Sequence, residues 1–98
     1  MQNKFLNMLG LCRKAGKLTL GFSKTKESVL KNKCKIIFIA SDISPKTEKE
    51  LLFITKNSSI EVIKTEFPIM EFCSCLDMKA GIAGIEDESF MTALKTKL

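Results

Sequence analysis

The stretch Leu18–Pro45 reads LTLGFSKTKESVLKNKCKIIFIASDISP and carries the strongest structural signals in the chain. Its centre predicts a strand over 35–40 that is buried on both faces, because residues 36–40 are continuously apolar and rich in β-branched side chains. Before it, Gly21 separates a short strand over 17–20 from a helix over about 22–32. After it, Ser44 can cap a further helix that has Pro45 at its first position. The stretch therefore predicts strand, helix, central strand and helix, in that order.

The flanking sequence continues this alternation. An amphipathic helix over about 2–14 precedes the stretch, with Phe5, Leu9 and Cys12 on its inner stripe. Beyond Pro45 we expect a helix over 45–57, a strand over 60–64, a short helix over 67–74, a strand over 80–85 and a helix over 87–97. Because such an order covers a sheet on both faces, the predicted fold is of the α/β class, a three-layer α/β/α sandwich with a four-stranded mixed sheet. We assign residues 1–98 to a single domain.

Apolar spacing also predicts which side chains face the core. The second helix should bury Phe22, Val29 and Leu30. The later helices should bury Leu51, Leu52, Ile54, Thr55, Ile69, Met70, Phe72, Phe90, Met91, Leu94 and Leu98. Gly81 and Gly84 lie in the last strand, where glycines imply close packing of a helix or backbone.

Positive charge is concentrated in the first third of the chain. The sequence holds 16 Lys and Arg against 11 Asp and Glu, a net charge of +5. Residues 1–35 contain nine basic residues and one acid, a net +8, whereas residues 36–98 contain seven basic residues and ten acids, a net −3. A field polarised in this way favours a polyanionic partner, and a solvated lysine-rich surface is the alternative.

Composition argues against a membrane, secreted or metal-dependent protein. The longest apolar run, 36–40, is too short to span a bilayer, and Asn7 and Arg13 interrupt what would be a signal peptide. We therefore expect a cytoplasmic protein with no membrane partner. The cysteines lack the spacing of a zinc ribbon and are expected to be free thiols, with a four-cysteine zinc site as the alternative. They are Cys12, Cys34, Cys73 and Cys75. No metal or other cofactor is expected.

The residue types also argue against an enzyme. The chain has no histidine, which excludes histidine triads, histidine metal sites and imidazole acid–base pairs. The run from Gly81 to Gly84 matches neither a dinucleotide fingerprint nor a Walker loop. The acidic run 86–88 could ligate a hard cation, but its place at a helix start favours stabilisation of the helix dipole. We expect no catalytic residues.

The junction at Gly21 is the strongest candidate for a functional site. A glycine turn from a strand into a helix leaves backbone N–H groups without helical partners and adds a partial positive charge, which suits a phosphate oxygen. Ser23 and Lys24 lie in the first turn, where polar side chains can reach base edges. Lysines close by in the sequence are Lys14, Lys17 and Lys26. A purely structural glycine is the alternative.

The run from Leu20 to Asp42, LGFSKTKESVLKNKCKIIFIASD, resembles the signature of the kink-turn RNA-binding ribosomal proteins. These include the archaeal large-subunit "seven-Ae" protein, the eukaryotic "thirty-e" protein and small bacterial paralogues. The match has no gap between Gly21 and Asp42, and coarser similarity covers nearly the whole chain, including LGLCRKAGK at 9–17. The resemblance implies the same sandwich fold and non-enzymatic binding of a kink-turn, or a similar bent and bulged stem, by a ribosomal or ribosome-associated protein. RNA is the implied partner, with ribosomal proteins as further candidates.

The resemblance also implies site residues. Ser23 and Lys24 occupy positions at which relatives contact sheared G·A pairs. Glu27 stands where relatives usually carry lysine, so Lys26 or Lys31 is the candidate for the phosphate contact. The implied positions at this end are Gly21, Phe22, Ser23, Lys24, Lys26, Glu27, Lys31 and Asp42.

The family's second contact is a loop before the last strand, usually Leu-Gly-x-x-x-Gly. The corresponding residues here are 70–75, MEFCSC, which contain neither glycine. Apolar contacts to an extruded base are expected from Phe72, Cys75 or Leu76, within a loop over 73–79. The reversed charge at Glu27 and the missing glycines leave an alternative: a protein-interaction module of the same fold, acting in translation or regulation.

Overall fold

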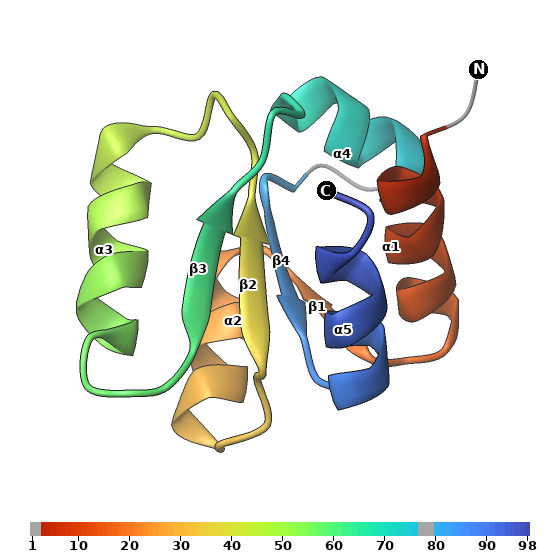
Figure 1. The fold of residues 1–98 in the computed structure, drawn as a ribbon. Helices are drawn as coiled ribbons and strands as arrows, with labels where there is room; N and C mark the ends of the chain where they lie inside the picture. The colour runs from red at the N-terminus through yellow and green to blue at the C-terminus, as the bar shows by residue number, and fades with distance from the viewer. Residues whose placement is uncertain (1–2, 77–79) are drawn as a thin grey trace.

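The computed structural model describes residues 3–76 and 80–98, and its helices and strands alternate along the chain as predicted (Figure 1). Three of the expected helices end two residues earlier than predicted, and the short helix predicted over 67–74 lies two residues further along the chain, at 69–76. The bounds are α1 (Lys4–Lys14), β1 (Leu18–Leu20), α2 (Phe22–Leu30), β2 (Ile36–Ile39), α3 (Pro45–Thr55), β3 (Glu61–Lys64), α4 (Ile69–Leu76), β4 (Ile82–Ile85) and α5 (Glu88–Lys95).

The four strands form one mixed sheet in the order β1-β4-β2-β3. β4 runs antiparallel to both of its neighbours, with Gly84 opposite Thr19 of β1 and Ile37 of β2. β2 and β3 run parallel, and Ile37 is paired with Val62. The mixed sheet predicted from the sequence is confirmed.

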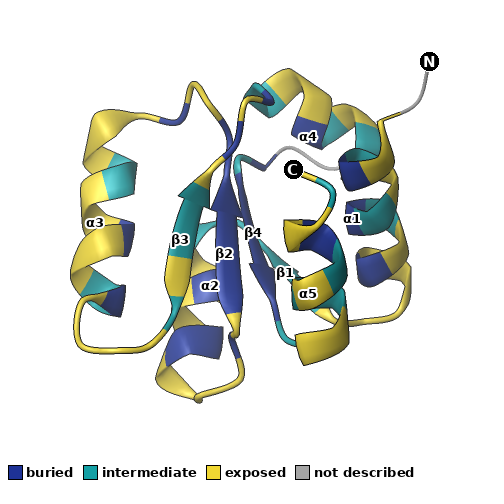
Figure 2. Cartoon of the chain, in the orientation of Figure 1, coloured by how far each residue is buried: buried dark blue, intermediate teal, exposed yellow. Residues whose placement is uncertain are grey.

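Helices cover both faces of the sheet, which confirms the three-layer architecture. α1, α4 and α5 lie on one face, and α2 and α3 lie on the other (Figure 1). The central strand β2 is buried throughout (Figure 2). Its side chains alternate between two apolar clusters, Ile36 and Phe38 on the α1 side and Ile37 and Ile39 on the α2 side. A continuous apolar run is therefore what this position requires.

Local capping explains where several helices begin. The Ser44 hydroxyl accepts a hydrogen bond from the Thr47 N–H at 3.2 Å, with Pro45 next to it at the first helical position. This confirms the predicted start of α3. The Asp87 carboxylate caps α5 by accepting from the Phe90 N–H at 2.9 Å. The acidic run at 86–88 thus includes a helix cap, as its position indicated.

The α2 helix packs closely on the sheet because Gly84 has no side chain. A Cβ atom at Gly84 would lie 2.5 Å from the Thr19 hydroxyl oxygen and 3.0 Å from Cγ2 of Thr25. Thr25 is fully buried, and its hydroxyl lies 3.0 Å from that of Thr19, at hydrogen-bonding distance. The close approach expected from the glycines of the last strand is confirmed.

Four apolar side chains expected in the core are instead exposed. They are Leu30 (70% exposed), Leu52 (48%), Met70 (78%) and Leu98 (55%). On α2 the inner stripe is formed by Thr25, Ser28 and Val29, and Leu30 follows on the solvent side. On α3 the buried positions are Leu51 and Thr55, four residues apart.

Candidate nucleic-acid interface

Gly21 turns the chain from β1 into α2 with φ 85° and ψ 168°, a backbone region that essentially only glycine adopts. Its N–H donates to the Ile82 carbonyl at 3.0 Å, and its carbonyl accepts from the Thr25 N–H at 3.2 Å. No described side chain caps this helix, unlike α1, α3 and α5. The amides of residues 22–24 have no acceptor inside the helix, so the structure presents an uncapped helix start.

The polar residues predicted for this end of the site lie along exposed parts of α2. Ser23 and Lys24 are exposed in the first turn, while Phe22 is half-buried against the apolar cluster on the α2 side of the sheet. Within the described parts of the chain, neither Lys24 nor Lys26 forms a salt bridge. The side chains that can donate to a phosphate at this corner are therefore not held by a carboxylate.

Lys24, Glu27 and Lys31 come together on one side of α2. They border a shallow hollow of about 210 Å³ that reaches β1 and the end of β4. The hollow is also lined by Thr19, Ser28, Lys33 and Glu86. The Ser28 hydroxyl donates to the Glu86 carboxylate at 2.6 Å, which joins α2 to the segment after β4. This bond and the buried Thr25 give the polar residues of α2 structural roles that sequence periodicity missed.

Glu27 forms an exposed ion pair with Lys31, at 2.9 Å and one helical turn apart. The hydrogen bond and charge of Lys31 lower the pKa of the Glu27 carboxyl. The opposite charges of this ion pair offset each other. The net positive charge on this side of α2 lies toward Lys24 and Lys33.

Lys14 and Lys17 lie at the opposite end of β1 from Gly21. Lys17 precedes the strand, and its carbonyl accepts from the Glu86 N–H at 2.9 Å. Lys17 and Gly21 are four residue steps apart along an extended strand, which corresponds to about 13 Å. Lys14 borders a different hollow, between α1 and α4. The lysines close to Gly21 in the sequence are thus divided between two ends of the strand.

Asp42 has a structural partner. Its carboxylate Oδ1 accepts a hydrogen bond from the Ile69 N–H at 2.8 Å, at the first residue of α4. A carboxylate at a helix start satisfies a free amide and suits the helix dipole. Asp42 therefore links the end of β2 to α4.

The prediction of a loop over 73–79 that makes the second RNA contact is wrong for residues 73–76, which are helical. Residues 69–76 form α4, and only 77–79 of the expected loop lie outside the described residues. Phe72 and Leu76 are fully buried in the α1-side cluster, so their side chains do not reach an outside base. Cys75 is half-buried and borders the same hollow as Lys14. Phe72 and Leu76 are four residues apart, so they lie on the same face of α4 and both pack into the core.

A further groove lies between α2 and α3, with a volume of about 320 Å³. Phe22 and Lys26 line one wall, and α3 supplies the other. The α3 side consists of Lys49, Glu50, Phe53 and Ile54. Phe53 is 67% exposed. It is not among the functional residues predicted from the sequence, although it is an aromatic residue that lies off the buried stripe of Leu51 and Thr55.

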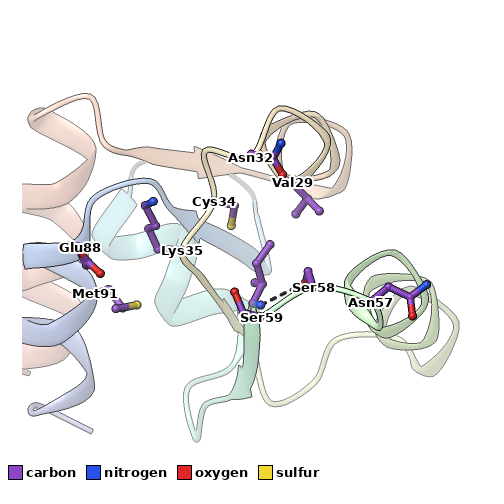
Figure 3. Close-up of a pocket in the computed structure, with 10 residues that line it drawn as sticks. Val29, Asn32, Cys34, Lys35, Asn57, Ser58, Ser59, Glu88 and Met91 are labelled. Carbon is purple, nitrogen blue, oxygen red and sulfur yellow. Dashed lines mark hydrogen bonds between the residues drawn. The ribbon is translucent and has the colours of Figure 1, made fainter.

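A hollow of about 540 Å³ lies at the end of the sheet where β2 begins (Figure 3). Cys34 and Lys35 enter it from the segment before β2, and Glu88 and Met91 border it from α5. The Ile60 N–H donates a hydrogen bond to the Ser58 hydroxyl at 3.2 Å; it is the dashed line that ends at Ser58 in Figure 3. None of the residues predicted for RNA lines this hollow.

The two buried thiols have strongly raised pKa values. Burial, with the charges of Asp87 and Glu86, raises the pKa of Cys12 to about 12. Burial raises the pKa of Cys34 to about 11. Both are thus protonated at neutral pH and are poor nucleophiles or metal ligands.

Residues 3–76 and 80–98 contain no cluster of three or more cysteines, aspartates or glutamates that could hold a metal ion. Within the same ranges, no helix has both the length and the apolar content needed to cross a membrane.

Comparison with known proteins gives consistent matches. The model of the Ribosomal protein L7Ae/L30e/S12e/Gadd45 family matches residues 3–70. The RNA-binding protein YlxQ of Enterococcus faecium is 35% identical over 97 residues, which cover 98% of this chain and 90% of the relative.

Solved structures share the fold at lower identity. A protein of unknown function from Bacillus halodurans superimposes with a TM-score of 0.88 at 22% identity, over 97% of this chain and 96% of its own. The Giardia lamblia 15.5kD RNA binding protein gives a TM-score of 0.76 at 11% identity, over 98% and 86% of the two chains. The family model spans most of the chain and the Enterococcus relative spans nearly all of it, so this chain belongs to the Ribosomal protein L7Ae/L30e/S12e/Gadd45 family.

Proposed function

We propose that this protein is a non-enzymatic, cytoplasmic RNA-binding protein that holds a kink-turn, or a similar bent and bulged RNA stem, at the start of α2. The observation that carries the proposal is the uncapped helix start at Gly21, next to the exposed Ser23 and Lys24. The Enterococcus relative, which carries the name RNA-binding protein, supports the same class of ligand. We place the protein at the ribosome or its assembly, in a single RNA-binding domain.

In this proposal, the amides of residues 22–24 bind a phosphate oxygen. Free N–H groups and the helix dipole act on the same anion, so no side chain has to reorganise. The Lys24 ammonium and the Ser23 hydroxyl then reach base edges of the bulged region, which RNA exposes where its helix is interrupted. Lys26 and Lys33 add attraction on either side.

Glu27 limits how far this positive region extends. Its carboxylate faces Lys31 at 2.9 Å, so the pair attracts phosphate less than two lysines would. The contact is therefore concentrated in the first turn of α2. Phe72 and Leu76 have no part in this proposal, because both are buried.

A second candidate function is a protein-interaction module of the same fold. Glu27 and the helical, glycine-free segment 69–76 favour it, because both depart from the pattern that the family uses to read RNA. The two candidates differ in their response to salt, since only phosphate contacts release condensed counterions.

The test is a titration of a kink-turn RNA and a plain duplex of equal length, each at two salt concentrations. We expect tighter binding to the bent RNA and weaker binding at high salt. Equal affinity for both RNAs would reject kink-turn recognition. A salt slope near zero would reject electrostatic RNA binding and favour the protein-interaction module.

Lys24→Ala should weaken binding to the bent RNA by about 1–3 kcal/mol, because the variant removes a charged contact to the base edges. Lys35→Ala is the matched control. It removes the same charge from an exposed position at the opposite end of the sheet, beside the hollow of Figure 3. Equal losses in the two variants would exclude Lys24 from the site.

A further inference from the structure

The groove between α2 and α3 combines an exposed aromatic ring with lysines. Phe53 lines it and leaves 67% of its surface exposed, and it is the one aromatic residue among the exposed large apolar side chains of the described residues. The Lys56 ammonium lies 4.6 Å from the centre of the Phe53 ring, a cation–π contact. This contact holds a positive charge at the ring without burying it.

Charge around the groove favours an anionic ligand. Lys26 and Lys49 line it, and Lys56 lies over the ring, against the single carboxylate of Glu50. None of these four residues forms a salt bridge within residues 3–76 and 80–98. The surface therefore attracts phosphate from several directions around one aromatic ring.

The groove is continuous with the start of α2. Phe22 and Lys26 form its α2 wall, and they flank Ser23 and Lys24, the residues proposed to contact the RNA stem. A strand that leaves a stem held at Gly21 along this side of α2 meets the groove within one helical turn, about 5 Å.

We propose that this groove binds an unpaired nucleotide that adjoins the RNA stem, with its base stacked on Phe53 and its phosphates near Lys26, Lys49 and Lys56. An aromatic side chain between lysines is the arrangement with which proteins hold single-stranded nucleic acid without strong sequence preference. This inference rests on the proposed RNA-binding function and gives it a second contact, which replaces the one expected from Phe72, Cys75 or Leu76. A phenylalanine offers no hydrogen bond, so the groove should accept any base.

The test compares three RNAs with the same kink-turn stem: a blunt one, one with a five-nucleotide single-stranded extension, and one with an abasic extension of equal charge. Each extension is placed on either strand end in turn. We expect the base-bearing extension to raise affinity by about tenfold on one end, and the abasic extension to raise it far less, because stacking requires a base.

Variants locate this gain. Phe53→Ala should abolish the gain and leave affinity for the blunt stem unchanged. Met70→Ala is the control, because it shortens another exposed apolar side chain, 78% exposed, on α4 across the sheet. A gain that survives in Phe53→Ala would overturn the inference. A full gain in Phe53→Leu would also overturn it. Apolar contact without stacking would then be sufficient, and the groove would suit a protein partner equally well.

The groove can also be tested if the stem itself does not bind. The chain contains no tryptophan or tyrosine, so Phe53→Trp places a single indole at the groove. Stacking of a five-nucleotide single-stranded RNA on that indole should quench its fluorescence. Quenching without stem binding supports the groove and rejects only the proposed function. Absence of quenching at millimolar oligonucleotide rejects the groove, whatever the stem does.

Discussion

Gly84→Ala should destabilise the protein, although alanine normally suits a strand better than glycine. The new Cβ would lie 2.5 Å from the Thr19 hydroxyl oxygen and 3.0 Å from Cγ2 of Thr25. Neither threonine can move freely. Thr25 is fully buried on α2, and the two hydroxyl groups lie 3.0 Å apart at hydrogen-bonding distance.

The loss of unfolding free energy can be estimated from the contacts that the new Cβ would displace. Turning the Thr19 hydroxyl aside breaks its bond to Thr25, which costs about 1 kcal/mol, and leaves a buried hydroxyl unpaired, which costs about 1–3 kcal/mol more. The lower flexibility of alanine in the unfolded chain offsets about 0.5–1 kcal/mol. The net loss is about 2 kcal/mol, which corresponds to a fall in Tm of about 10 °C for a domain of this size.

Urea unfolding followed by circular dichroism measures this loss, and a double-mutant cycle assigns it. In a Thr19→Ala background the closest atom is gone, so Gly84→Ala should cost about 1 kcal/mol less. Thr19→Ser keeps the hydroxyl and should keep the full penalty. Gly10→Ala is the control. Its Cβ would meet only the Cys75 carbonyl, at an ordinary 3.6 Å, within a helix that alanine stabilises.

The outcome that would refute the reasoning is a Gly84→Ala protein as stable as the wild type. Strict additivity with Thr19→Ala would be equally damaging, because it would show that the hydroxyl is not the atom in the way. Either result would mean that α2 does not rest on the sheet through this contact.

Three further predictions use the same unfolding assay. Gly21→Ala should lower the free energy of unfolding by about 1–3 kcal/mol, because its φ of 85° and ψ of 168° suit glycine alone; no loss would show that the corner relaxes. The pKa of Cys12 rises from 9.0 to about 12 on folding, so the folded state keeps a proton that the unfolded state loses. Stability should therefore fall as pH rises above 9, and fall less in Cys12→Ala; parallel pH profiles would contradict this. Leu51→Ala should cost about 2–5 kcal/mol because the side chain is fully buried, whereas Leu52→Ala, at 48% exposure, should stay within about 0.5 kcal/mol.

The sequence predicts the layers of this fold because its strongest patterns are local. The apolar run 36–40 predicts a strand that is covered on both faces. Ser44 and Pro45 predict the start of α3, because serine caps a helix and proline suits its first position. The close packing at Gly84 also follows from residue type. In each case the physical cause lies within a few residues of its effect.

The errors arise where the cause is distant in the sequence. The start of α4 depends on the Asp42 carboxylate, 27 residues before Ile69, which no local pattern shows. Thr25 and Ser28 occupy core positions because Thr19 and Glu86 lie at hydrogen-bonding distance from their hydroxyl groups. Because helical periodicity predicts apolar residues at buried positions, it places Leu30 in the core instead of these two polar residues.

The geometry around the candidate site also has both local and distant causes. The uncapped start of α2 follows from one glycine and its neighbours. Which lysines accompany it depends on how β1 and α3 lie in space. Lys14 and Lys17 are near Gly21 along the chain but not at the same end of β1, whereas Lys49 of α3, distant in the sequence, shares a groove with Phe22.

The place of β4 in the sheet has a consequence for synthesis on the ribosome. β4 is the last strand to be translated, yet it lies between β1 and β2, two of the first. A nascent chain that has emerged only through α4 lacks the strand that joins them, and it exposes backbone groups on both sides of the gap. Cooperative folding therefore waits until residue 85 has left the exit tunnel, so a chain stalled before β4 should be sensitive to proteases, however many of its helices have formed.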